Sequence, residues 1–567
     1  MPIRFKPVNC KNCYKCVRNC PVKAIKIKNH QAQIMVDACI LCENCTIVCP
    51  QNAKEERNEI PRIRELMQEG KKVIASVNSA YIAQYPVENF EQMRSALKRL
   101  GFTDARESAE GAYLVKKEYE KILGEGDVEF AISSRCPTIV QLVEKKYPQL
   151  MKYLMPVLSY YNAHAKYIKS QEPEAVVVCI SPCISTWSEL QEPTNAIDYV
   201  ISFEELEQWM EQEQIAFTEE QDDSHYLSRI AVLSNGFLDS MEKNRKYDYI
   251  GVDGIENCKN VLEEIAAGGM EHYYVELSAC HGGCIGGPSF RKKKQRNRLE
   301  GTLAIRNSAI DRGVAPECAP DYDINCDLDL SRQFMRSGVH EEMPTEEQIL
   351  EILQKMGKTA LEDELNCSAC GYNTCRDKAI AIFQNKAEIS MCIPYMREKE
   401  EQYANKIVSA MPGLLVTVND ELQVIQMNRA AMDLFDIKRK KNIIGQPVSM
   451  IMDDYEIVNM LAFDKSFAQD KLYLEEENVY LERVFTRDRQ NGLIICAMKN
   501  VTKETLYHQE VHKMKVAAAE MADELAVEQM KLVQQIAGLL GETAADTKVA
   551  VEKLKETIML DPQTRKK

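Results

Sequence analysis

Residues 10–21 read Cys10-Lys-Asn-Cys13-Tyr-Lys-Cys16-Val-Arg-Asn-Cys20-Pro21, and residues 39–50 read Cys39-Ile-Leu-Cys42-Glu-Asn-Cys45-Thr-Ile-Val-Cys49-Pro50. The two runs share one spacing, Cys-x2-Cys-x2-Cys-x3-Cys-Pro. A cubic iron–sulfur cluster needs four thiolates that converge on its corners, and a tight loop with this spacing supplies three of them. The repeated spacing therefore predicts two 4Fe–4S clusters near the start of the chain.

The doubled run resembles that of bacterial two-cluster ferredoxins, in which the fourth cysteine of each run binds the other cluster. Zinc sites and disulfides are the alternatives, but zinc sites usually use separated Cys-x2-Cys pairs. Clusters imply an electron relay in a reducing, cytoplasmic setting. The resemblance assigns two ligand sets, which are Cys10, Cys13, Cys16 and Cys49 for one cluster, and Cys20, Cys39, Cys42 and Cys45 for the other.

Composition is typical of a soluble globular protein. The chain has 567 residues, of which 45% are hydrophobic and 28% charged, and this length allows about four domains. The formal net charge of −15 argues against a nucleic-acid partner. We expect neither a membrane span nor secretion, because long apolar runs and an apolar leader segment are absent from the sequence. The basic tract Arg291–Arg298 is interpreted as a solvated loop rather than a docking patch for an acidic partner.

The rest of the chain changes character several times. Short β runs at 72–77, 128–133, 175–180 and 247–252 alternate with helical stretches, which favours an α/β domain with mostly parallel sheets. We expect a multidomain α/β protein with five segments, which are a ferredoxin-like domain with two 4Fe–4S clusters (1–56), an α/β domain (57–345), a small helical four-cysteine domain (346–400), an α+β domain (403–503) and a helical output or dimerisation tail (504–567).

Four cysteines of the α/β segment follow or end predicted strands, where loops present ligands to a cleft. Their contexts are Ser133-Ser-Arg-Cys136-Pro, Ser181-Pro-Cys183 and Glu276-Leu-Ser-Ala-Cys280-His-Gly-Gly-Cys284-Ile-Gly-Gly287. Glycines around the last two allow the backbone to approach a bulky cluster closely. The pattern predicts a four-thiolate metal site. The other cysteines are expected to be buried, free or structural, and they are Cys179, Cys258, Cys318, Cys326 and Cys496.

The order and context of these four cysteines resemble the large subunit of iron-only (FeFe) hydrogenases, whose motifs are TSCCP, MPCxxKK and ExMACxxGCxxGGGQ. The resemblance covers about residues 1–345, because a two-cluster ferredoxin domain is a common accessory domain in that family. Carried over by position, Cys136, Cys183, Cys280 and Cys284 would hold the 4Fe–4S part of the H-cluster. Cys284 would also bridge to a diiron subsite.

Departures from the family motifs concern the diiron subsite rather than the four ligands. The family's proton-relay cysteine is Arg135 here, and an arginine cannot shuttle a proton at neutral pH. Thr186 replaces the lysine that steadies the diiron ligands. Glu118 and Glu120 lie near the family's relay carboxylates, but solvated residues on a charged helix are the favoured interpretation. The remaining replacements are Ser181, Ser278, Pro288 and Ser289.

A third cysteine pattern, Cys367-x2-Cys370-Gly-Tyr-Asn-Thr-Cys375-x16-Cys392, follows the α/β segment. It resembles the small iron–sulfur domain attached to corrinoid proteins and to some electron-transfer subunits. The Cys-Gly-x-x-x-Cys turn with a following helix and a late cysteine favours a 4Fe–4S cluster, although spacing alone leaves zinc open.

Residues 410–435 resemble the start of a PAS domain, because a strand, a turn and a second strand lead into Asn428-Arg-Ala-Ala and a short helix. Since no histidine lies between Tyr403 and Val501, a histidine-ligated haem is excluded there. Flavin, an empty apolar pocket or a dimerisation module remain open. Tail positions 514, 518, 521, 525, 532 and 539 form an apolar stripe, which packing of two helices, or of a partner, would bury. Gly541-Glu-Thr543 predicts a helix stop and a new N-cap.

The sequence therefore predicts a cytoplasmic iron–sulfur protein that senses redox state or hydrogen. Electrons would pass between the 4Fe–4S clusters and a hydrogenase-like centre, and the PAS domain and tail would signal. The alternatives are a functional low-turnover hydrogenase, another reductase, a cubane-only electron carrier, or a scaffold whose PAS domain only dimerises. Expected partners are electron-donor and electron-acceptor proteins, a downstream phosphatase or kinase, and a second copy through the PAS domain or tail.

Overall fold

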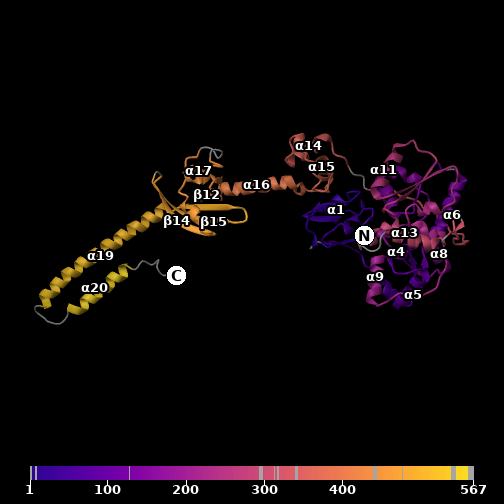
Figure 1. Ribbon diagram of the computed structural model, residues 1–567, viewed down its shortest axis with the longest axis horizontal. Coiled ribbons are helices and arrows are strands. Elements are labelled where there is room, and N and C mark those ends of the chain that lie inside the picture. Colours follow the sequence, from indigo (N-terminus) through magenta and orange to yellow (C-terminus); the bar gives the residue numbers. More distant parts are fainter. Residues whose placement is uncertain are drawn as a thin grey trace. The chain divides into compact units, whose positions relative to one another are not determined.

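The computed structural model describes residues 3–6, 9–126, 128–292, 298–311, 313–315, 318–338, 342–437, 443–475, 477–537 and 544–559. The chain forms two compact units, Met1–Met396 and Arg397–Lys567, and each is described by itself (Figure 1). The first unit contains all the cysteines with cluster spacing. The finer limits of the five predicted segments remain a prediction.

The N-terminal segment repeats one local structure for each cysteine run. Helix α1 (Lys15–Arg18) and helix α2 (Asn44–Ile47) each begin one residue before the third cysteine of their run. The preceding residues, Tyr14 and Glu43, have left-handed backbones with φ of 54° and 55°. This bend turns the loop back on itself, as three ligands from one loop require. Two antiparallel pairs complete the segment, β1 (Ile3–Phe5) with β4 (Lys54–Glu56) and β2 (Ile25–Lys28) with β3 (Gln31–Ile34).

Two parallel sheets form the centre of the first unit, as predicted from the buried apolar runs. The first has the strand order β6-β5-β8-β9 and the second has the order β10-β11-β7. The strands are β5 (Val73–Val77), β6 (Asp104–Glu107), β7 (Phe130–Ile132), β8 (Val176–Ser181), β9 (Tyr199–Ser202), β10 (Asp248–Asp253) and β11 (Tyr273–Ser278). Because parallel strands end at the same edge, loops that follow different strands can meet there.

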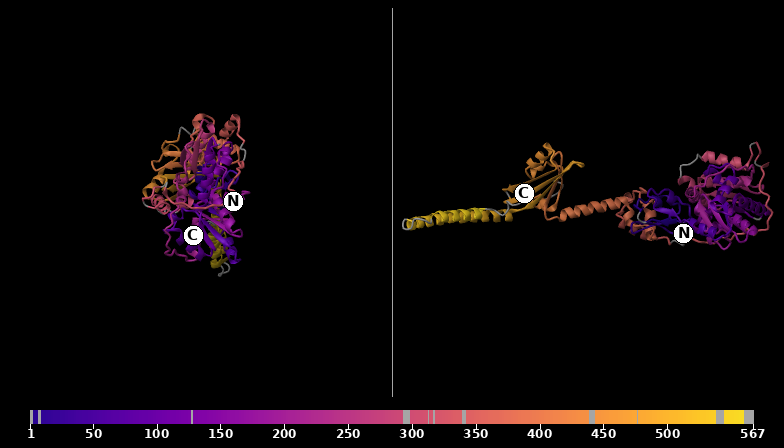
Figure 2. Two further views of the ribbon diagram at one scale, coloured as in Figure 1. Left: turned by 90° about the vertical axis from the view of Figure 1, so that its right-hand side faces the viewer. Right: turned by 90° about the horizontal axis from the view of Figure 1, so that it is seen from below.

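Helices connect and cover these strands, as views from two further directions show (Figure 2). Ser202 caps α9 (Phe203–Gln212) in a capping box with Glu205, and an irregular stretch follows that helix from residue 213 to residue 226. The helices are α3 (Ile60–Gln68), α4 (Tyr81–Gln84), α5 (Phe90–Leu100), α6 (Ala109–Glu125), α7 (Pro137–Lys146), α8 (Tyr160–Gln171), α9 (Phe203–Gln212), α10 (Gly236–Ser240), α11 (Ile255–Ala267), α12 (Pro288–Lys292) and α13 (Arg298–Ala309). Most of the predicted basic loop lies outside the described residues.

The third cysteine segment contains α14 (Glu346–Lys355), α15 (Cys375–Phe383) and the start of α16 (Ile393–Ala410). It packs against the N-terminal segment, and Val17 and Tyr372 belong to one hydrophobic core. The Ile27 amide donates to the Lys386 carbonyl at 3.0 Å across this contact. The two segments therefore form one packed body despite their separation in sequence.

The second unit contains a five-stranded antiparallel sheet with the order β13-β12-β16-β15-β14. Asn428 caps α17 (Arg429–Leu434) by accepting from the Ala431 amide, as the Asn-x-Ala-Ala pattern predicts. This α+β arrangement is PAS-like. Its other elements are β12 (Leu414–Asn419), β13 (Val424–Met427), α18 (Tyr455–Ala462), β14 (Phe467–Leu474), β15 (Val479–Asp488) and β16 (Leu493–Asn500).

Two tail helices, α19 (Thr502–Ala537) and α20 (Ala544–Met559), run side by side (Figures 1 and 2). This pairing leaves the predicted apolar stripe exposed, since Met521 and Leu525 are each 59% accessible. The groove between the helices is lined by Leu525 of the stripe and by residues beside it, including Ala526 and Met530. Leu539 and the predicted N-cap Thr543 lie outside the residues whose structure or side-chain burial is described.

Candidate iron–sulfur centres

Thiols of one of the two predicted ligand sets lie close together in the N-terminal segment. Burial raises the pKa of Cys42 well above its ordinary value, and its thiol neighbours Cys20, Cys45 and Cys39 raise it further. These four residues are one predicted ligand set. A buried neutral thiol ionises only when a metal binds it, so this grouping has the donor chemistry that a 4Fe–4S cluster needs.

Lys54 supplies a positive charge between the two sets. Its side chain is 6% exposed and forms a hydrogen bond with Cys16. Burial alone would lower the pKa of Lys54, but Cys16, Cys45 and Cys49 raise it above its ordinary value. The ammonium group of Lys54 therefore contacts Cys16 of one predicted ligand set and lies near Cys45 of the other.

The four middle cysteines come together from three loops at the ends of β7, β8 and β11. Burial raises the pKa of Cys280 to about 12, and Cys136 and Cys284 are among the groups that raise it. Burial also raises the pKa of Cys183, and the charges of Glu43 and Cys280 raise it further. Thiols from residues that are distant in sequence thus face one another, as the hydrogenase resemblance implied.

Glycines allow the loop that carries two of these ligands to pack closely. Gly283 has φ of +77°, and a Cβ there would lie 2.5 Å from the Val232 carbonyl oxygen. A Cβ at Gly286 would lie 1.8 Å from the His281 carbonyl oxygen. Other residues at these positions would displace the backbone between Cys280 and Cys284.

Glu43 links the N-terminal thiols to the middle thiols. It follows Cys42 directly, is 2% exposed, and accepts a hydrogen bond from the Ile184 amide at 3.1 Å. Ile184 in turn follows Cys183. Lys145 adds a second link, since its Nζ donates to the Cys39 carbonyl at 2.7 Å. These contacts bring the second ferredoxin set next to the middle site.

The third cysteine set lines one small cavity. All four of its thiols contribute to the wall, together with Lys378. Lys378 is 1% exposed and donates to the Ile389 carbonyl at 3.1 Å. The cavity is lined mainly by residues of this motif, and the four cysteines are Cys367, Cys370, Cys375 and Cys392.

Two tyrosines lie between the third set and the N-terminal set. Burial raises the pKa of Tyr14, and Cys10 and Cys370 contribute to the rise. Burial raises the pKa of Tyr372 as well, with Cys370 and Cys20 as the further causes. Each phenol therefore has thiol neighbours from both segments, which places the two cluster regions next to each other.

The surroundings of Cys284 test whether a diiron group fits beside the cluster. The Tyr160 hydroxyl lies 3.7 Å from Cys284 Sγ, and the Asn78 amide donates to the hydroxyls of Tyr160 and Tyr161 at 3.0 and 2.9 Å. On another side is the guanidinium of Arg135, discussed below. These polar groups bind one another. The wall around Cys284 thus consists of hydrogen-bond donors and a cation, which suits the thiolates of a four-cysteine cluster, while Thr186 replaces the lysine that would steady a diiron group.

The replacements seen in the sequence have defined structural roles. Ser181 Oγ donates to the Cys183 carbonyl at 2.8 Å, which fixes the ligand loop. Thr186 Oγ1 is buried and has no hydrogen-bond partner among the described residues. Glu118 and Glu120 each pair with a lysine on α6, but their side chains are 35% and 12% exposed, so the expectation of solvated side chains is wrong for Glu120.

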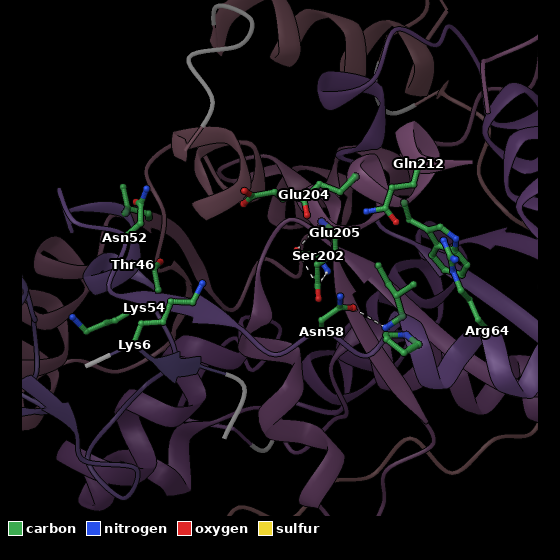
Figure 3. Close-up of a pocket in the computed structure, with 15 residues that line it drawn as sticks. Lys6, Thr46, Asn52, Lys54, Asn58, Arg64, Ser202, Glu204, Glu205 and Gln212 are labelled. Carbon is green, nitrogen blue, oxygen red and sulfur yellow. Dashed lines mark hydrogen bonds between the residues drawn. The ribbon is translucent and has the colours of Figure 1, made fainter. Parts of the chain in front are cut away.

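A polar pocket of about 750 Å³ lies elsewhere in the first unit (Figure 3). Lys6, Thr46, Asn52 and Lys54 come from the N-terminal segment, and residues of α3 and α9 form the other wall. Glu205 in that wall already accepts from Ser202 in the capping box. The lining contains no thiol among the described residues, so we do not assign the redox chemistry to this pocket.

Among the described residues, no three His, Cys, Asp or Glu side chains are arranged to hold a single metal ion. The five cysteines outside the motifs are free. Cys179, Cys258 and Cys496 are buried, whereas Cys318 is exposed. None of the described helices is apolar over a length that could cross a bilayer.

The fold and its thiol sets define a multidomain iron–sulfur protein with a ferredoxin-like domain and a hydrogenase-like α/β domain. Comparison with family models identifies the parts. Residues 71–237 and 232–288 match the iron only hydrogenase large subunit, C-terminal domain. Residues 9–53 match the 4Fe-4S dicluster domain, and residues 363–394 match a model of Fe–S cluster domains. The chain thus resembles the large subunits of iron-only hydrogenases.

Curated relatives cover parts of the chain. The NADP-reducing hydrogenase subunit HndD of Solidesulfovibrio fructosivorans is 23% identical over 323 residues, which are 44% of this chain and 55% of that protein. One subunit of an ion-translocating oxidoreductase complex from Methanosarcina acetivorans is 40% identical over 50 residues, which are 9% of this chain and 19% of that protein. The chain spans about half or less of the length of these relatives.

The solved structures that the chain matches include FeFe-hydrogenases and PAS domains, each with a TM-score below 0.5. A FeFe-hydrogenase studied for oxygen inactivation has a TM-score of 0.38 and 14% identity, over 50% of this chain and 100% of that chain. The apo FeFe-hydrogenase HydA1 of Chlamydomonas reinhardtii has a TM-score of 0.33 and 15% identity, over 49% and 99%. The PAS domain of an HTR-like protein from Haloarcula marismortui has a TM-score of 0.16 and 8% identity, over 18% and 98%.

Proposed function

We propose that this protein is an iron–sulfur regulatory protein that senses redox state or hydrogen and signals through its PAS-like domain and tail. Four 4Fe–4S clusters would be held by the sixteen cysteines of the motifs, with one cluster in each ligand set. In each transfer, one cluster loses one electron and its neighbour gains it. The signal is then the redox state of the clusters rather than the turnover of a substrate.

The observation that carries this proposal is the position of α16. The helix begins at Ile393, directly after Cys392, and continues to Ala410, four residues before strand β12 begins (Figure 1). The Cys392 carbonyl accepts from the Met396 amide at 2.9 Å, so a cluster ligand also starts the helix. A change at the third cluster therefore acts on the first turn of a helix that leads into the PAS-like domain.

Contacts between the cysteine sets support an electron route. The third set faces the N-terminal set across Tyr14 and Tyr372, and Glu43 connects the N-terminal set to Cys183. The route would run between the third cluster, the two ferredoxin clusters and the middle centre. Electron-donor and electron-acceptor proteins are its proposed external partners.

The tail offers a surface for the output. The α19 stripe exposes Met514, Met521, Leu525 and Leu532, each more than half accessible. An apolar helical stripe of this kind is suited to binding another helix. We propose a second copy of the chain as its partner, with a phosphatase or kinase downstream.

The test measures amide hydrogen exchange along α16 in oxidised and reduced protein, both purified without oxygen. We expect reduction to change exchange in the first turns of α16, and Cys392→Ser to abolish that change. Cys318→Ser is the control, because this exposed cysteine lies outside the motifs. Identical exchange in both redox states would refute signalling through α16.

Iron content and the infrared spectrum decide between sensing modes after coexpression with hydrogenase maturation factors. Iron at roughly 16 per chain without bands of iron-bound CO and CN⁻ would support a redox sensor with four cubanes. Such bands would instead establish a diiron subsite and make hydrogen the sensed molecule. High hydrogen turnover from the pure protein would refute the regulatory role in favour of a working hydrogenase.

A further inference from the structure

Arg135 lies immediately before the ligand Cys136 and is 3% exposed. Its Nη1 donates to the Ala231 carbonyl at 2.5 Å and its Nη2 donates to Ser278 Oγ at 2.7 Å. Nη2 also lies 2.7 Å from Glu276 Oε1. These three acceptors, one in the turn Leu227–Val232 and two on β11, therefore fix the orientation of the guanidinium group.

Glu276 is equally enclosed, with 1% of its side chain exposed. Its other oxygen accepts from the Leu238 amide at 2.7 Å. Burial raises the pKa of Glu276, and Arg135 is the largest cause that opposes the rise. A buried pair of this kind costs desolvation energy, and replacing it with apolar residues would often be neutral for stability. Stability alone does not explain why the pair lies beside a ligand site.

The cysteine ligands give Arg135 a second set of anionic neighbours. Arg135 directly precedes Cys136, and its partner Ser278 lies two residues before Cys280. Cys284 and Cys136 are also among the groups whose charges act on the guanidinium. Because a guanidinium group is charged at neutral pH, Arg135 places a positive charge beside the ligand loops. Tyr160 would also stabilise negative charge on Cys284, because its hydroxyl lies 3.7 Å from Cys284 Sγ and would donate a hydrogen bond to a thiolate there.

We propose that Arg135 sets the midpoint potential of the cluster held by Cys136, Cys183, Cys280 and Cys284, as a fixed positive charge that favours its reduced form. A 4Fe–4S cluster with four thiolates is anionic, and one added electron increases its negative charge. A cation held nearby in a medium of low dielectric constant stabilises the more negative state. The electron comes from a neighbouring ferredoxin cluster, which is oxidised by one electron, and no bond is made or broken.

This inference rests on the proposed function, because it takes the four thiols to hold a cluster. It adds the direction of electron flow, since a cluster of raised potential collects electrons from the ferredoxin clusters. Arg135 would be a positioning charge and not a catalytic residue. Arg135 stands where the hydrogenase family has its proton-relay cysteine. With this positive charge, the site would store an electron rather than transfer a proton.

The experiment is a redox titration of the full chain with reconstituted clusters, followed by electron paramagnetic resonance. Cys183→Ser first identifies the signal of the middle cluster. We expect Arg135→Gln to lower its midpoint potential by at least 59 mV, which is a tenfold change in the ratio of reduced to oxidised cluster for one electron. The other signals should keep their potentials, and Arg135→Lys should retain most of the wild-type value.

Arg229→Gln is the matched control. Arg229 pairs with Glu107 at 2.9 Å, and both side chains are 3% exposed, but its electrostatic neighbours are Glu107 and tyrosines rather than thiols. This variant should leave the middle potential unchanged. Equal shifts in Arg135→Gln and Arg229→Gln would refute a specific role for Arg135.

The double variant Arg135→Gln/Glu276→Gln covers the case in which the single variant does not fold, because it removes both buried charges together. It should show a smaller fall in potential than Arg135→Gln, because loss of the Glu276 carboxylate acts in the opposite direction, and a potential above the wild-type value would overturn the inference. If no signal disappears in Cys183→Ser, the thiols hold no such cluster and the inference fails with it. If Arg135→Gln shows the expected fall in potential but hydrogen exchange in α16 is the same in oxidised and reduced protein, only the signalling function is refuted.

Discussion

Gly371→Ala should separate the third cysteine segment from the ferredoxin-like domain. Gly371 has φ of +95°, and a Cβ built there would lie 3.0 Å from both Cβ and Cγ1 of Val17 and 3.1 Å from the Arg18 amide nitrogen. Val17 is completely buried, and Gly371 lies between the ligand Cys370 and the bridging Tyr372. The added methyl group therefore enters a packed contact between two cluster regions.

The cost has two parts. An alanine in the left-handed region costs roughly 1–2 kcal/mol, and overpacking a buried contact costs roughly 1–3 kcal/mol. Only the second part acts on docking, since the atoms that clash belong to different segments. At its upper end of about 3 kcal/mol it corresponds to roughly a hundredfold change in the docking equilibrium, because about 1.4 kcal/mol gives tenfold.

Hydrogen exchange at the contact measures this change. The Ile27 amide donates to the Lys386 carbonyl at 3.0 Å, and the Asn29 amide donates to Glu388 Oε1 at 2.9 Å. Both amides should lose protection by roughly a hundredfold in Gly371→Ala. Electron transfer between the third cluster and the ferredoxin clusters should slow in the same variant.

Two further variants separate backbone strain from the steric contact. Gly70 has φ of +76° and no atom within 4 Å of a built Cβ, so Gly70→Ala adds strain alone and should leave the contact amides protected. In a double-mutant cycle, Val17→Ala should reduce the effect of Gly371→Ala, because it removes the atoms that clash. Full protection of the Ile27 and Asn29 amides in Gly371→Ala would refute this reasoning.

Three other predictions concern different parts of the molecule. Burial lowers the pKa of His164 below 6.5, and Glu110 opposes this fall in pKa. The unfolded state therefore binds more protons than the folded state. The contribution of His164 to stability is present above about pH 6.5 and is lost as the pH falls. Calorimetry should therefore show a larger fall in Tm on acidification for the wild type than for His164→Gln. Arg483→Gln should destabilise the PAS-like domain by about 3 kcal/mol, measured by hydrogen exchange, because Arg483 is 1% exposed and forms a salt bridge with Asp470. The control Arg487→Gln should destabilise it by less than about 1 kcal/mol, because the acidic partners of Arg487 are exposed. Met521→Lys with Leu525→Lys should shift a dimer to monomer in sedimentation, with Glu524→Lys as the exposed control, and a monomeric wild type would contradict pairing through the stripe.

The strands could be predicted because their signal is local. The run at 175–180 is continuously apolar, as a strand covered on both faces requires, and it forms β8 (Val176–Ser181) between two parallel neighbours. The Asn428 cap was equally visible, since a cap acts within three residues. The partner of each strand was not predicted, because pairing joins segments that are distant in sequence.

The ligands were predicted by the same principle, because a cluster loop fixes the spacing of its cysteines. The groups that surround the ligands were missed. Arg135 and Ser278 are 143 residues apart, and the contact of Arg18 with Ala369 spans 351 residues. Spacing contains no information about such contacts. The sequence shows a charged residue next to the ligand Cys136. The groups that accept hydrogen bonds from Arg135 are distant in sequence, so only the structure identifies them.

The tail shows the limit of periodicity. The apolar stripe is predicted to become buried by packing, but the face of α19 that α20 covers includes only Leu525 of the stripe, together with Ala526 and Met530, among the described residues. Both faces have helical spacing, so the sequence pattern could not choose between them. The exposed stripe therefore remains available for a partner.

Buried cations give the three cluster regions a common electrostatic plan and also distinguish them. Lys54 lies beside the ferredoxin thiols, Lys378 beside the third set and Arg135 beside the middle set. Each offsets part of the cost of burying an anionic cluster, although the chain as a whole carries −15. The two lysines are point charges on flexible stems, whereas Arg135 is a planar group held by three acceptors. The charge beside the middle set is therefore held in one orientation when the cluster changes its charge. We therefore expect electrons to collect at the middle centre before the other clusters are reduced.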